Sequence, residues 1–112
     1  MHVAAALGLE VRVDDFGPAA RAIAAEYDPR AATIRVNARL LAGRGDAAET
    51  IAACVAHELY HHLEHLGCAS LERTRHAREE RADAYARSAF SLIVDPAEIR
   101  GVVNCCPIHK RI

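Results

Sequence analysis

One long segment of the sequence, residues 46–66, constrains the fold most, because it lacks glycine and proline and has helix signals at both ends. Asp46 is a favourable N-cap residue, and Glu49 three positions later completes a capping-box pattern. Gly67 follows, and glycine is the usual residue just beyond a helix end. At helical spacing, one wide apolar arc of this segment would face a core. The arc comprises Ile51, Ala52, Val55, Ala56, Leu59, Leu63 and Leu66.

The chain before this helix shows strand signals. Residues 9–14 alternate apolar and polar side chains, and residues 32–37 form a second strand pattern. Between them, Asp28-Pro29-Arg30 is typical of a turn, because proline restricts φ and aspartate can bond its own backbone. Residues 21–27 are ambiguous, since their alanines suit a helix and their place before the turn suits a hairpin arm. We expect a small three-stranded sheet over residues 9–37.

The remaining segments complete the expected architecture. Residues 40–45 form a connection, and a second helix is expected over about residues 70–91. A short third helix is expected over residues 96–103, and the tail over residues 104–112 has no periodicity. These elements predict an α+β fold, in which the sheet packs on the long helix and an antiparallel second helix. The 112 residues suffice for a single domain.

Charge and cysteine content argue against several classes of function. The formal net charge of -1 provides no basic surface for nucleic acid. No apolar run approaches the roughly 20 residues that a membrane span needs. The four cysteines show no C-x-x-C spacing, and the first residues lack the basic start of a signal peptide. We therefore expect a cytoplasmic protein that contacts neither nucleic acid nor membranes directly.

The long helix contains a pattern with a definite chemistry. His57 and His61 are four residues apart, so both project from one helix face and can direct ring nitrogens at one metal ion. Glu58 lies in the same turn, within reach of a water on that metal. This is the H-E-x-x-H arrangement of zinc peptidases, in which the glutamate removes a proton from metal-bound water. The sequence therefore predicts one zinc ion per chain.

The second helix offers a third ligand. Glu79 and Asp83 are again four residues apart, so Glu79 could bind the metal while Asp83 accepts the second ring N–H of a ligating histidine. Glu80 and Glu72 are the alternatives to Glu79, and both are ordinary candidates for surface residues. Glu80 points about 100° away from Asp83, which favours Glu79. A histidine third ligand is excluded, because the H-E-x-x-H-x-x-G-x-x-H pattern would need glycine at Glu64 and histidine at Gly67.

These residues carry a family resemblance. HELYHHLEH followed by EERADAYA resembles the gluzincin zinc peptidases, and among them the ImmA/IrrE-type metallopeptidases, whose pattern is HExxH followed by ExxA(N/D)xFA. The upstream YDPRAATIRVN resembles the hairpin before their active-site helix, and the small size is similar to that of the minigluzincins. Tyr85 stands where the family has phenylalanine. The resemblance implies that His57, His61 and Glu79 bind zinc, that Glu58 is the general base, and that an edge strand seats an extended peptide.

Other polar residues have ordinary roles as their default. Tyr60 or Tyr85 could donate a hydrogen bond to the oxyanion of a tetrahedral intermediate, and the sequence does not choose between them. His62 falls in the apolar arc, which favours a buried histidine with a polar partner. His65 and His76 are expected at the surface, and Cys54 is expected to be a small buried thiol.

The tail contains three residues that can bind zinc, Cys105, Cys106 and His109. Our hypothesis is that one of them occupies the open coordination position and holds the enzyme latent, whereas the alternative is a disordered terminus. Truncation after Val103 would then increase peptide cleavage, and unchanged activity would contradict latency.

The sequence is compatible with three functions. The first is a zinc peptidase acting on a peptide or protein substrate. The second is a metal-binding regulatory or latent module with little turnover, which acts through a protein partner or as a homo-oligomer. The third is a plain interaction domain, in which the histidines only cover a helix face, and metal content distinguishes it from the other two.

Overall fold

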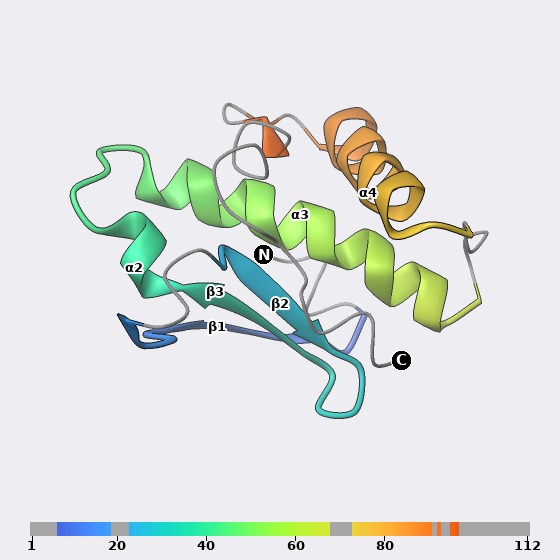
Figure 1. Cartoon of the computed structure of the whole chain (residues 1–112), viewed down its shortest axis with the longest axis horizontal. Helices are drawn as coiled ribbons and strands as arrows, with labels where there is room; N and C mark the ends of the chain where they lie inside the picture. Colours follow the sequence, from blue (N-terminus) through green and yellow to red (C-terminus); the bar gives the residue numbers. More distant parts are fainter. Residues whose placement is uncertain (1–6, 19–22, 68–72, 91, 93–94, 97–112) are drawn as a thin grey trace.

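The computed structural model describes residues 7–18, 23–67, 73–90, 92, 95 and 96. A three-stranded sheet, one short helix and two longer helices follow one another along the chain (Figure 1). This is the expected α+β architecture. The elements are β1 (Glu10–Asp14), β2 (Ala25–Asp28), β3 (Thr33–Asn37), α2 (Ala38–Leu41), α3 (Ala47–His65) and α4 (Arg75–Ala89).

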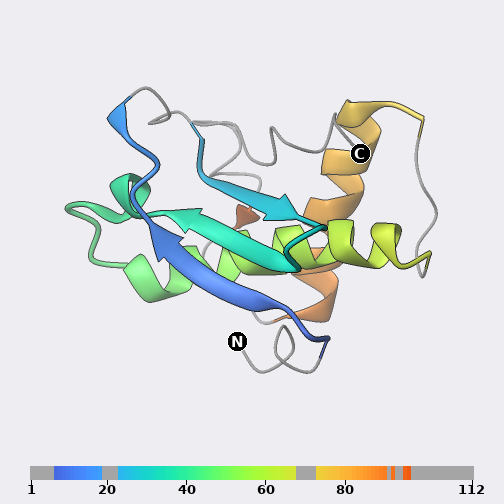
Figure 2. The ribbon, with the colours of Figure 1, turned by 90° about the horizontal axis from the view of Figure 1, so that it is seen from below.

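The sheet has the order β1-β3-β2, so the last strand in sequence lies in the middle (Figure 2). β1 runs parallel to β3, with Val11 beside Ile34, and β2 runs antiparallel to β3. The ambiguous segment before the turn is therefore a hairpin arm from Ala25 onward. The expected turn is present, and Asp28 Oδ1 accepts a hydrogen bond from the Arg30 backbone N–H at 2.9 Å.

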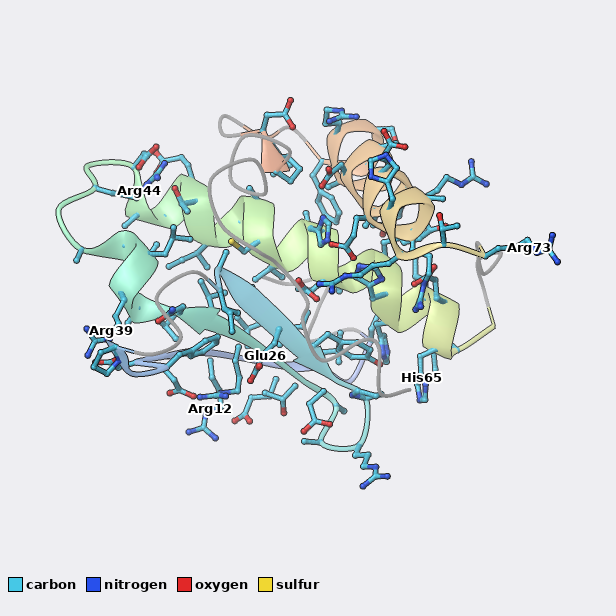
Figure 3. All side chains as sticks on the ribbon, in the orientation of Figure 1. Arg12, Glu26, Arg39, Arg44, His65 and Arg73 are labelled. Atoms are coloured by element: carbon cyan, nitrogen blue, oxygen red, sulfur yellow. The ribbon has the colours of Figure 1, made fainter. Side chains whose placement is uncertain are left out.

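The two faces of the sheet differ in polarity. On the outer face, Arg35 forms ion pairs with Asp14 at 3.1 Å and with Glu26 at 2.5 Å. Figure 3 shows Arg12 and Glu26 on the side of the sheet that faces away from α3. The inner face packs on α3, which lies between the sheet and α4 (Figure 1). Burial of apolar side chains stabilises this layer, which contains Ala25, Tyr27, Ile34, Val36, Val55 and Leu59.

The ends of α3 agree only in part with the sequence analysis. Gly67 has a φ of 78°, and its N–H donates to the carbonyl of Glu64 at 3.1 Å, as expected beyond a helix end. The capping-box prediction is wrong, because the Asp46 side chain makes no cap hydrogen bond and pairs instead with Arg44. Leu66 is also 51% exposed, so the apolar arc ends before it.

Two other boundaries are corrected. The expected connection over residues 40–45 begins inside a short helix, α2, because the Asn37 side chain accepts the Arg39 backbone N–H at its N-terminus. The second helix begins at Arg75 rather than near residue 70, because the Thr74 hydroxyl caps it by accepting the Ala77 N–H at 3.1 Å. Apart from Pro96, the expected third helix and the tail lie outside the described residues. No helix in the described part of the chain combines the length and apolar character needed to cross a membrane.

Candidate metal centre

The candidate site lies where α3 and α4 pack against each other. Contacts between the helices pair His57 with Asp83, His61 with Glu79 and Glu64 with Arg78. Residue numbers rise along α3 as they fall along α4, so the two helices run antiparallel. Spacings of three and four residues on each helix therefore meet across one interface.

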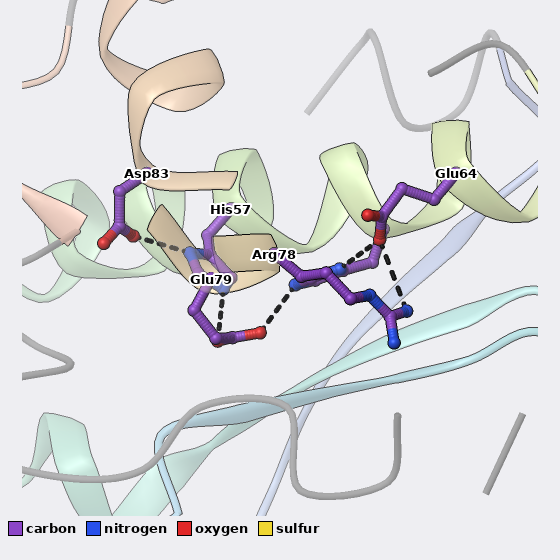
Figure 4. Close-up of polar contacts among 6 residues, drawn as sticks. His57, Glu64, Arg78, Glu79 and Asp83 are labelled. Carbon is purple, nitrogen blue, oxygen red and sulfur yellow. Dashed lines mark hydrogen bonds and ion pairs between the residues drawn. The ribbon is translucent and has the colours of Figure 1, made fainter. Parts of the chain in front are cut away.

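His57 is held by two carboxylates of α4 (Figure 4). Its Nδ1 lies 2.7 Å from Asp83 Oδ1, and its Nε2 lies 3.0 Å from Glu79 Oε2. Only 1% of the His57 side chain is exposed. Because an ionised carboxylate can only accept hydrogen bonds, the two neighbours favour a proton on each ring nitrogen of His57.

His61 has a matching pair of carboxylate neighbours. Its Nδ1 lies 2.7 Å from Glu64 Oε1, and its Nε2 forms an ion pair with Glu79 Oε1 at 3.0 Å. The two Glu79 oxygens thus each face the Nε2 atom of a different histidine. Arg78 approaches Glu64 from α4, with Nη2 at 3.5 Å from the same oxygen that accepts from His61 (Figure 4).

The pKa values reflect this arrangement. Burial alone would lower the pKa of His57, but hydrogen bonds to Asp83 and Glu79 outweigh it and raise the pKa to about 10. The pKa of His61 is raised in the same way, against burial, by Glu64 and Glu79. Burial would raise the pKa of Glu79, yet its hydrogen bonds with both histidines hold it far below the usual range. A metal that binds both Nε2 atoms must therefore displace protons.

The residues fit a divalent metal ion. His57, His61 and Glu79 each offer a ligand atom, and the three atoms lie within 4.8 Å of one another. Each Nδ1 faces its own carboxylate, which fixes the tautomer that leaves Nε2 available to a metal. Two imidazoles and one carboxylate form a donor set of catalytic zinc sites.

Charge supports the same conclusion. Four carboxylates of the site are buried, and burying so many anions is unfavourable unless cations compensate them. Protons on the two histidines compensate part of this charge in the metal-free chain. A divalent ion carries the same charge as the two protons that it would replace, so the site keeps its charge balance on loading. The buried acids are Glu58, Glu64, Glu79 and Asp83.

Of the other predicted site residues, only some lie in the part of the chain that the structure describes. Glu58 is fully buried beside His57, and its negative charge contributes to the raised pKa values of both histidines. The Tyr60 ring lies against that of His61, with centroids 6.1 Å apart, while Tyr85 packs on Tyr60 at 5.7 Å. Cys105, Cys106 and His109 lie outside the described residues.

The described histidines outside the predicted ligand set lie as expected. His62 is buried, and its Nδ1 lies 2.7 Å from the Tyr27 hydroxyl of β2, which ties the site helix to the sheet. His65 is exposed, as Figure 3 also shows, and His76 lies at the surface near Glu80. Cys54 is a buried thiol, and burial raises its pKa to about 12.

Two residues of the site were missed in the sequence analysis, Glu64 and Arg78. Glu64 was considered only as a mismatch to another zinc motif. The spacing of three residues from His61 on one helix face was a usable signal. Arg78 had no such signal, because its relation to Glu64 depends on how α4 crosses α3.

Comparisons with protein-family models, with curated proteins and with solved structures found no match.

Proposed function

We propose that the chain is a zinc-dependent peptidase of the gluzincin type. The observation that carries the proposal is the convergence of His57 Nε2, His61 Nε2 and the Glu79 carboxylate, with a carboxylate behind each histidine. Glu58 lies in the same helical turn as His57. We further propose a peptide or protein substrate and a cytoplasmic location.

Each residue of the proposed site would have a different role in peptide hydrolysis. Zinc bound by His57, His61 and Glu79 would polarise the scissile carbonyl and lower the pKa of a bound water. Glu58 would accept a proton on its carboxylate and later deliver it to the leaving amine. Asp83 keeps the His57 ring oriented by accepting its Nδ1–H.

An extended substrate would pair with an edge of the sheet. In the described sheet, β1 and β2 are the edge strands. We propose β2, because Tyr27 links this strand to the site helix through His62. Backbone pairing of this kind gives affinity with little dependence on side chains.

One observation favours a second function, a latent or regulatory metal module that works through a partner. Glu58 is 0% exposed and His57 is 1% exposed, so a substrate must gain access before catalysis. A module that remains in this state would bind zinc and turn over little.

Metal removal tests the proposal. Treatment with a strong chelator is expected to abolish peptide cleavage, and stoichiometric zinc is expected to restore it. Zinc at about 100 times its Kd should also stabilise the fold by about 2.7 kcal/mol, because it binds only the folded chain. The measurements are metal content, cleavage of a mixed peptide library and thermal unfolding with and without zinc.

The outcomes separate the functions. Zinc binding with chelator-sensitive cleavage supports the peptidase. Zinc binding without cleavage of any peptide favours the latent module. A chain that binds no zinc contradicts both and leaves the plain interaction domain.

A further inference from the structure

The Glu64 side chain is buried in the site and contacts His61, a predicted metal ligand. Its side chain is 2% exposed, and Oε1 lies 2.7 Å from His61 Nδ1. A solvated glutamate three residues from a histidine would contribute little, because water screens such pairs. Burial makes this contact stronger and also makes an unpaired carboxylate costly.

Arg78 compensates the buried charge of Glu64. Its Nη2 lies 3.5 Å from Glu64 Oε1, and its side chain is 21% exposed. A guanidinium is always charged and can only donate hydrogen bonds, so it favours the carboxylate form of Glu64. The same Glu64 oxygen faces the guanidinium and His61 Nδ1, and as a carboxylate it accepts the His61 N–H.

We propose that Glu64, supported by Arg78, is a positioning residue for His61, as Asp83 is for His57. This inference rests on the proposed metal site. The reason is that a ligating imidazole must carry its proton on Nδ1 and keep its ring in one orientation. Asp83 lies on the opposite helix, whereas Glu64 lies on the same helix as its histidine. Glu64 therefore orients His61 within α3, and Arg78 links this pair to α4.

Zinc affinity of Glu64 variants tests the proposal. Glu64→Leu removes the acceptor and is expected to weaken zinc binding by about 10- to 100-fold, as measured by chelator competition. Glu64→Gln keeps an oxygen acceptor of the same size without its charge, and a smaller loss is expected. Glu80→Gln is the matched control, because Glu80 is an exposed glutamate whose described partner is His76.

A spectroscopic readout distinguishes positioning from a merely structural contact. In the cobalt-substituted protein, each ligating histidine should give a hyperfine-shifted, exchangeable Nδ1–H resonance. We expect two slowly exchanging resonances in the wild type and in Glu80→Gln. In both Glu64 variants, the resonance of His61 should exchange faster, while that of His57 should remain.

The measurements distinguish failure of the positioning role of Glu64 from failure of the proposed metal site. If the wild type binds zinc and both Glu64 variants match Glu80→Gln in affinity and exchange, the positioning role is wrong and the metal site stands. If the wild type binds neither zinc nor cobalt, the proposed function and this inference both fail. Should Glu64→Leu not fold, the isosteric Glu64→Gln decides the outcome by the same two measurements.

Arg78 provides an independent check through a double-mutant cycle. Arg78→Met is expected to weaken zinc binding less than Glu64→Leu does, because it acts only through the Glu64 charge. In the Glu64→Gln background, the same change should have almost no effect, since the charge that it supports is gone. Additive effects of the two substitutions would contradict this linkage.

Discussion

Replacing Glu58 with glutamine is expected to leave zinc binding intact and to reduce peptide cleavage by about 100- to 10,000-fold, the contribution of a general acid–base group. Glutamine has nearly the same size, so a fully buried position can accept it. It cannot accept the proton from a metal-bound water. The measurements are zinc content per chain and the rate of peptide hydrolysis at saturating zinc.

Glu49→Gln is a suitable control for this substitution. Glu49 lies in the first turn of the same helix. The Glu49→Gln substitution also removes a carboxylate from α3, but this carboxylate lies far along the helix from the histidines. Zinc content and cleavage should therefore match those of the wild type. If Glu58→Gln retained zinc and cleaved every tested peptide at the wild-type rate, the peptidase proposal would be wrong.

The substitution with the largest expected effect on metal binding is Glu79→Gln. Each Glu79 oxygen lies 3.0 Å from the Nε2 atom of a histidine, so this carboxylate connects the two predicted ligands. Loss of an outer-shell partner costs about 10- to 100-fold in metal affinity. A direct ligand should cost more, so we expect a loss above about 100-fold, measured by chelator competition.

The metal-free form of Glu79→Gln provides a second measurement. Glu79 helps to raise the pKa of His57 to about 10, so its replacement should move that pKa back toward the ordinary value. The direction is fixed, because removing an anion disfavours the protonated imidazole. Histidine resonances followed by NMR across a pH titration would report the shift.

The neighbouring glutamate gives a matched control. Glu80 follows Glu79 directly, but its side chain is 61% exposed and lies 3.3 Å from His76. An exposed pair of this kind contributes at most about 1 kcal/mol. Glu80→Gln should therefore retain zinc affinity and the His57 pKa. If both substitutions weakened zinc equally, Glu79 would not be a ligand.

Features of the molecule that depend on local spacing can be predicted from the sequence alone. Residues 57 and 61 share a face of α3 because the helical repeat brings positions four apart together. The break at Gly67 and the turn at Asp28 follow from the backbone preferences of single residues. The position of Asp83, four residues after Glu79, likewise predicts it as a partner for a ligating histidine.

Which carboxylate of α4 faces which histidine depends on the tertiary structure. Asp83 faces His57, and Glu79 lies between the two rings. These pairings depend on how α4 crosses α3, and no spacing within one helix encodes that crossing. The same holds for the sheet, where β3 lies between β1 and β2. Strand order and helix crossing arise from burying apolar faces of distant segments together, a requirement that local sequence patterns do not specify.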